Sequence, residues 1–286
     1  MTITIDPTKN IGIIFQLRSG STALQQYLAS RFHMANIMEL FNAYTNNNFL
    51  TGPASGKNTL PPPAKPTAPS LTPWPATTRI EALLHLDERV TALQAFNAQG
   101  KLGVFKVNVM SYMKDYPTFS DVLASQTNIQ FINLERADVL YSLISRFLSV
   151  QTGDWNIFGN TPRPINAPAG TTYAFSAAQV RLAFDEYLAK RDHIAAHFPT
   201  VPTIYYEEFQ NNPANLSNMI AGGDINSQGR IAVSKFTDNH KLLISNLAEV
   251  EAIYQEYVRL HPTYFPASTG KVPGVAIPVA QGNQPT

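Results

Sequence analysis

The chain has 286 residues, 44% of them hydrophobic, which is enough for one large α/β domain or two small ones. Only 14% are charged and the net charge is +1, so no overall field favours nucleic acid or an anionic membrane. There is no cysteine, which excludes disulfides, thiolate metal sites and a cysteine nucleophile. No secretory leader and no apolar run of about 18 residues is found, so we expect a cytoplasmic protein without a membrane span.

Four short apolar segments rich in β-branched residues predict buried strands: residues 10–17, 102–110, 129–134 and 201–206. Apolar residues at helical spacing predict helices over residues 23–32, 79–97, 138–150, 176–197 and 241–260. Strands that alternate with helices indicate a mostly parallel central sheet covered on both faces. Ligands of such sheets bind at the carboxyl ends of the strands.

Proline and glycine mark the two segments that do not follow this pattern. Residues 52–75 contain eight prolines, which can neither pair into a sheet nor continue a helix. We expect a surface insertion there, either a lid or a segment without a role. We expect residues 268–286 to be a loosely ordered tail, and residues 1–267 to form a single α/β domain.

The turn after the first strand has the residues of an anion site. Arg18, Ser19, Gly20, Ser21 and Thr22 stand between a buried strand and a helix. The start of a helix offers unpaired N–H groups and the positive end of the helix dipole. Glycine allows the backbone to approach an anion closely, the hydroxyls add donors, and arginine adds a fork of donors suited to phosphate. The turn is therefore predicted to bind a nucleotide phosphate.

This turn is not the phosphate loop of ATPases and kinases. That loop reads G-x-x-x-x-G-K-[ST], whereas Phe15 stands here at its first glycine and Ser21 at its lysine. The missing lysine argues against triphosphate and Mg²⁺ chemistry. The run R-S-G-S-T-A-L instead resembles the 5′-phosphosulfate loop of PAPS-dependent sulfotransferases, most closely the bacterial branch that includes trehalose sulfotransferases. The resemblance implies a P-loop-like three-layer α/β/α fold, PAPS as sulfuryl donor with PAP as product, and no metal.

A second motif follows the third predicted strand, which ends at Glu135 and Arg136. Sulfotransferases hold the 3′-phosphate of PAPS with an arginine at such a strand end and a serine in the next helix. The bacterial spacing of nine residues gives Ser145, with Asp138 also in agreement. Ser142 lies one turn earlier on the same helix face and is the alternative.

The same resemblance assigns roles to three further residues. Glu39 matches the proposed general base of the bacterial branch, although Ile37 replaces a proline of that motif, and His33 is the rival base. Lys106 matches a lysine near the active site, so it would contact the transferred sulfonate or the acceptor unless it faces out from an edge strand. Lys235 would reach the nucleotide.

The segment that follows the fourth predicted strand reads Y-Y-E-E-F over residues 205–209. It resembles a family segment, Y-E-D-L, that ends a strand and is mostly structural. We therefore predict a structural role for it.

Taken together, the resemblance implies transfer of a sulfuryl group from PAPS to a hydroxyl or amine of a small-molecule or carbohydrate acceptor. One alternative is a small-molecule or nucleoside kinase with a degenerate loop, which would need ATP and Mg²⁺. Another is a nucleotide-binding module without catalysis. The sequence identifies neither the acceptor nor an oligomeric state.

Overall fold

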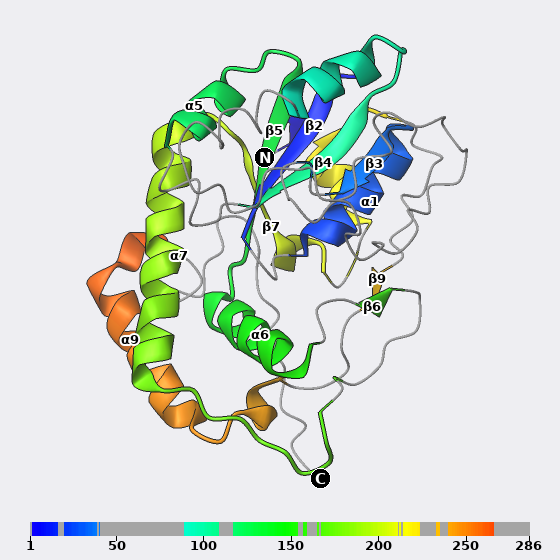
Figure 1. Cartoon of the computed structure of the whole chain (residues 1–286). Helices are drawn as coiled ribbons and strands as arrows, with labels where there is room; N and C mark the ends of the chain where they lie inside the picture. Colours follow the sequence, from blue (N-terminus) through cyan, green and yellow to red (C-terminus); the bar gives the residue numbers. More distant parts are fainter. Residues whose placement is uncertain are drawn as a thin grey trace, which may run out of the picture.

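A computed structural model describes residues 2–16, 20–38, 40, 89–108, 117–153, 157–158, 165, 167–210, 212, 214–223, 233–234 and 240–265. At its centre is a five-stranded sheet in the order β3-β4-β2-β5-β7 (Figure 1). All four pairings between neighbours are parallel. The strands are β2 (Asn10–Phe15), β3 (Ala35–Met38), β4 (Gly103–Asn108), β5 (Ile129–Glu135) and β7 (Thr203–Tyr205). The predicted α/β class with a parallel central sheet is confirmed.

The helices follow the strands in alternation, as the sequence predicts. They are α1 (Ser21–Arg31), α5 (Pro117–Ala124), α6 (Val139–Thr152), α7 (Ala177–His197), α8 (Asn215–Met219) and α9 (Leu247–Leu260). Residues 89–97 are also helical, and short 3-10 turns are η1 (Tyr206–Glu208), η2 (His240–Leu243) and η3 (Pro262–Tyr264). Two short pairs, β1 (Ile3–Thr4) with β8 (Ile220–Ala221) and β6 (Ile157–Phe158) with β9 (Val233–Ser234), lie outside the central sheet.

Both faces of the sheet are buried under helices. On one face, Ile11 and Ile13 of β2 pack against Leu24 and Leu28 of α1. On the other face, Ile14 packs with side chains of the helix at residues 89–97, of α5 and of the end of α7. A third apolar cluster joins α6, α7 and α9, and α9 lies along α7 (Figure 1). Since β2 is buried on both faces, its continuous apolar run is what the sheet requires.

The sequence did not predict β3, α5 or α8, and one predicted helix differs from the one observed. The strand β3 was missed, because Asn36 in its centre has low β-propensity and pairing with β4 decides its conformation. The helix predicted over residues 241–260 is broken: η2 ends at Leu243 and α9 begins at Leu247. In the break, Asn246 exchanges hydrogen bonds with the backbone of Phe175 at 2.8 and 3.1 Å, which a continuous helix would not allow. The predicted insertion at 52–75 and tail at 268–286 lie outside the described residues.

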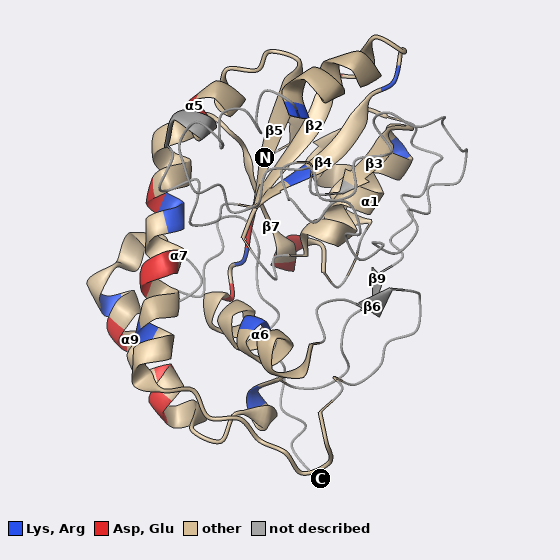
Figure 2. Ribbon diagram, in the orientation of Figure 1, with Lys and Arg blue, Asp and Glu red and all other residues tan. Residues whose placement is uncertain are grey.

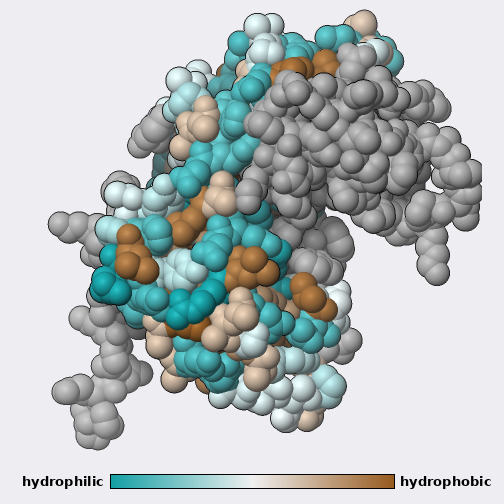
Figure 3. Space-filling view, turned by 60° about the vertical axis from the view of Figure 1, so that its left-hand side comes forward, coloured by the Kyte–Doolittle hydropathy of each residue, from teal (hydrophilic) through white to brown (hydrophobic). Residues whose placement is uncertain are grey.

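The outer surface over α7 and α9 is mostly hydrophilic, and its hydrophobic residues are separated from one another (Figure 3). Single exposed hydrophobic residues of this kind are normal for a folded protein. Within the described part of the chain, no helix is both long and apolar enough to cross a membrane.

The chain changes direction across the sheet between β2 and β5. From β2 it runs through α1 to the edge strand β3, whereas from β5 it runs through α6 and α7 to the opposite edge, β7. Phe15 at the end of β2 pairs with Leu134 near the end of β5, so the two loops leave the sheet side by side. Ligands of parallel sheets bind at such a switch point.

His193 of α7 predicts how the stability of this fold depends on pH. Its ring is buried within 2.7 Å of the Ser120 hydroxyl. Burial, with a smaller contribution from His197, lowers the pKa of His193 from 6.5 to about 4, while Asp121 partly opposes this. Between these two values the unfolded chain binds the proton more readily, so the free energy of unfolding falls as pH falls through this window.

We expect His193→Gln to lose less stability than the natural chain between pH 7 and pH 5, as measured by urea unfolding. The exposed His33, changed to Asn, is the control, because Asn tolerates the positive φ of 53° found there. Equal losses for the His193→Gln variant and the natural chain would contradict the prediction.

Candidate functional site

The first predicted motif lies at the carboxyl end of β2 and opens α1. Gly20 precedes the helix with φ +80°, and no described side chain caps the helix start. Ser21 and Thr22, the first two helical residues, are buried. The amino end of α1 therefore keeps the features of an anion site, which are backbone N–H groups and the positive helix end.

Gly20 is needed for its conformation and for its lack of a side chain. A positive φ is costly for residues with a Cβ atom. A Cβ at position 20 would lie 2.2 Å from Cδ2 of Tyr206, a residue of η1. The aromatic ring thus packs closely against Gly20, and the turn leaves no room for a side chain at this position.

Lys106 joins the turn from the neighbouring strand. It lies on β4, which is an internal strand, and its side chain is buried. Its Nζ donates a hydrogen bond of 3.2 Å to Oγ1 of Thr22 and lies 5.5 Å from the centroid of the Phe15 ring. The lysine therefore faces the start of α1, where its charge adds to that of the helix end.

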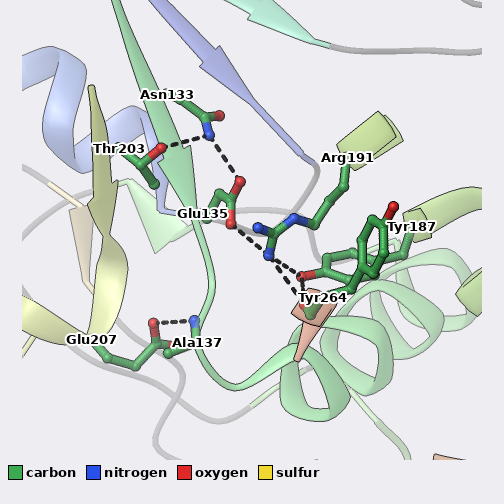
Figure 4. A network of polar contacts seen from close by, with 8 residues as sticks. All are labelled: Asn133, Glu135, Ala137, Tyr187, Arg191, Thr203, Glu207 and Tyr264. Carbon is green, nitrogen blue, oxygen red and sulfur yellow. Dashed lines mark hydrogen bonds and ion pairs between the residues drawn. The ribbon is translucent and has the colours of Figure 1, made fainter. Parts of the chain in front are cut away.

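The second predicted motif lies beside the first, at the carboxyl end of β5. Nε of Arg136 donates a 2.6 Å hydrogen bond to Oε1 of Glu207, and the two side chains are largely buried. The other carboxylate oxygen of Glu207 accepts a 2.8 Å bond from the backbone N–H of Ala137 (Figure 4). Glu207 thus fixes both the orientation of the guanidinium and the turn between β5 and α6.

Tyr206 connects the two motifs. Its ring packs against Gly20, and the Cζ of Arg136 lies 4.6 Å from the centroid of the same ring. The sequence predicted a structural role for residues 205–209 and did not identify Tyr206 or Glu207 as part of the site. Their position could have indicated a role in the site, because both residues follow directly after a strand, at the edge of the sheet where ligands bind.

A buried ionic network lies next to this edge of the sheet and joins β5 to α7 (Figure 4). Glu135, the last residue of β5, pairs with Arg191 of α7 at 3.0 Å and accepts a 2.9 Å bond from Nδ2 of Asn133. Arg191 also donates to the hydroxyl of Tyr187 and to the carbonyl of Tyr264. Burial raises the pKa of Tyr187, which keeps its hydroxyl protonated. A buried charge needs such partners, and here they tie β5 to α7.

A hollow that is open to solvent lies next to Arg136 between α6 and α7. Ser142 lines this hollow together with Arg136. Ser145 is only 4% exposed and is not among the lining residues. Of the two serines that the sequence left open, Ser142 is therefore the one that shares a ligand-accessible space with Arg136.

Four of the predicted site residues lie outside the described residues: Arg18, Ser19, Glu39 and Lys235. The rival base, His33, is exposed at the end of α1. No three His, Asp or Glu side chains in the described part of the chain are arranged to hold a metal ion.

Comparison of the chain with protein-family models gives no match. Comparison with curated proteins likewise finds no related sequence.

Replacement of Gly20 by Ala tests the contact between the turn and Tyr206. We expect Gly20→Ala to lower the free energy of unfolding by more than the 1–2 kcal/mol, roughly, that a left-handed alanine costs. Gly100→Ala is the matched control, since Gly100 has φ +71° but nothing within 4 Å of an added Cβ. Tyr206→Ala in the Gly20→Ala background should recover part of the difference in urea unfolding. Equal costs at positions 20 and 100 would contradict the contact.

Proposed function

We propose that this chain is a sulfotransferase, which moves a sulfuryl group from PAPS to a hydroxyl or amine of a small-molecule or carbohydrate acceptor. The observation that carries the proposal is the meeting of two sequence motifs at one edge of the sheet. The turn at Gly20 and the strand end at Arg136 are far apart in sequence, and Tyr206 contacts both. Both motifs are ones that the sequence assigned to phosphate groups.

The residues at this edge fit a nucleotide with two separate phosphate groups. The start of α1, with the hydroxyls of Ser21 and Thr22, suits the 5′-phosphosulfate, and Arg18 and Ser19 precede it in the same turn. Arg136 and Ser142 suit the 3′-phosphate, in place of the Ser145 of the bacterial spacing. Lys235, in the segment before η2, would complete the nucleotide site.

PAPS, when bound, supplies an activated sulfuryl group, so the protein has to position the donor and acceptor and stabilise negative charge. Lys106 is suited to this, because its buried ammonium group lies at the start of α1 beside Thr22. Arg18 would add a second positive charge. Glu39 would accept the proton of the acceptor hydroxyl, since a carboxylate within hydrogen-bond reach acts as a general base.

The kinase alternative is disfavoured by the residues themselves. Ser21 occupies the position of the lysine that reaches the β- and γ-phosphates in ATPases and kinases. The loop itself therefore has no lysine at this position. Lys106 contacts Thr22 of the turn, but it comes from the neighbouring strand β4.

Ligand binding tests the proposal directly. We expect PAP to raise the melting temperature of the protein, with no comparable effect of ATP with Mg²⁺, because a ligand stabilises the folded state that it binds. Arg136→Met should reduce the affinity for PAP about tenfold or more, the effect of losing a hydrogen bond between charged groups. Arg259→Met, on the exposed side of α9, is the control and should bind PAP normally. Absence of a shift at millimolar PAP would overturn the sulfotransferase proposal.

Lys106 is expected to distinguish the donor from the product. PAPS carries the sulfonate and PAP does not. Lys106→Met should therefore lower the affinity for PAPS about tenfold more than it lowers the affinity for PAP. Calorimetric titration with both nucleotides measures the ratio without the need for an acceptor. Lys101→Met, just before β4, is the control, and thermal unfolding verifies that each variant is folded. An equal loss for PAPS and PAP would show that Lys106 does not contact the sulfonate.

A further inference from the structure

The hollow between α6 and α7 gathers three cations from separate elements. Arg136 comes from the turn after β5, Arg146 from α6 and Lys190 from α7. Figure 2 shows the single basic residue of α6, which is Arg146, in an otherwise uncharged helix. Among the described residues, no carboxylate lines the hollow.

The nearby carboxylates do not neutralise these three charges. Glu207 bonds to Nε of Arg136 at 2.6 Å, and Glu186 bonds to Nη1 of Arg146 at 3.0 Å. Lys190 makes neither a hydrogen bond nor an ion pair within the described part of the chain. Among the described residues, the hollow therefore has more positive than negative charges around it.

The environment of Lys190 is unfavourable for an ammonium group without a ligand. Burial, with a smaller contribution from the charge of Arg146, lowers the pKa of Lys190 from 10.5 to about 8, while Glu186 partly opposes both. A bound anion would offset the lost hydration and the repulsion between the cations.

The donors of the hollow, which is open to solvent, define the class of anion. Arginine presents paired N–H groups that match the oxygens of phosphate and sulfate. The hydroxyl of Ser142 and the side chain of Gln16 add neutral polar groups to the lining.

We infer that the hollow is a binding site for a phosphate or sulfate ester group, whose oxygens Arg146 and Lys190 hold beside Arg136. This assignment gives α7 and the middle of α6 a ligand-binding role. It depends on the charges and the shape of the hollow and does not require the proposed sulfotransferase activity.

Calorimetric titration of the full chain with inorganic sulfate tests the site at pH 6.5 and low salt. We expect Lys190→Met to weaken sulfate binding about tenfold, the effect of losing a hydrogen bond between charged groups. Glu186→Gln should tighten sulfate binding by about threefold, because it frees Arg146 from a partly exposed ion pair. This gain cannot result from misfolding. Lys9→Met, at the opposite end of β2, is the control and should have no effect.

The pH dependence of sulfate binding is a second test, because a lysine with a purely structural role would not change it. The charged and titratable groups that face Lys190 are Arg146, Glu186, Arg136 and Tyr187. Burial raises the pKa of Tyr187, so its hydroxyl does not titrate between pH 6.5 and 9.5. Sulfate stays a dianion throughout, so its affinity should fall as pH rises through about 8 in the natural chain and stay level in Lys190→Met.

The turn after β2 also attracts anions, so the titrations are repeated in an Arg18→Ala background. Competition with PAP, in the chain that keeps Arg18, distinguishes two sources of the ester group. If the 3′-phosphate of a nucleotide occupies the hollow, sulfate competes with PAP. Lys190→Met then lowers the affinity for PAP but not the affinity for AMP, which has no 3′-phosphate. If a separate ester occupies it, sulfate still binds to protein saturated with PAP. Both results support the site.

The inference is overturned if Lys190→Met and Glu186→Gln bind sulfate as Lys9→Met does. Failure of PAP to bind would overturn only the proposed function, because the sulfate titrations do not involve the nucleotide.

Discussion

The parallel pairing of β2 with β5 is the constraint on which the site depends. The pairing runs from Asn10 with Ile129 to Phe15 with Leu134, and nearly all of both strands is buried. A shift of one residue would exchange the side chains that β2 buries against α1 for those that it buries on the opposite face, and it would disrupt the close packing of both clusters. The loops after β2 and β5 must then emerge side by side. The contacts of Tyr206 with both motifs need in addition the pairing of β5 with β7, because Tyr206 directly follows β7.

Cations at this edge of the sheet are held in place by their neighbours. Arg136 is fixed by Glu207, Arg191 by Glu135, and Lys106 bonds to Thr22. Buried charges require partners of this kind, and the same partners orient the positive groups before a ligand arrives. Lys190 differs, because it makes neither a hydrogen bond nor an ion pair within the described part of the chain, and burial disfavours its charge. This difference is why the hollow, rather than the buried network of Figure 4, is assigned an anionic ligand.

Most of the fold could be predicted from local pattern, and the exceptions have tertiary causes. The sequence predicted strands at β2, β4, β5 and β7, because apolar runs that end in turns indicate strands of a parallel sheet. The edge strand β3 was missed, since its polar centre is made a strand by pairing with β4. The helix over 241–260 was predicted as continuous. The hydrogen bonds between Asn246 and Phe175 that accompany its break join residues 71 positions apart, so no local pattern indicates them.

For the candidate site, the sequence by itself determined which residue types stand at the turn after β2 and at the end of β5. It also left Ser142 and Ser145 as alternatives, because both lie on one face of α6. The tertiary structure decided that Ser142 shares a hollow with Arg136, that Lys106 faces Thr22, and that Tyr206 lies between the two motifs. A sequence pattern records the periodicity of one element. The contacts that build this edge join elements up to 186 residues apart, from Gly20 to Tyr206, and only the packing of the whole sheet brings them together.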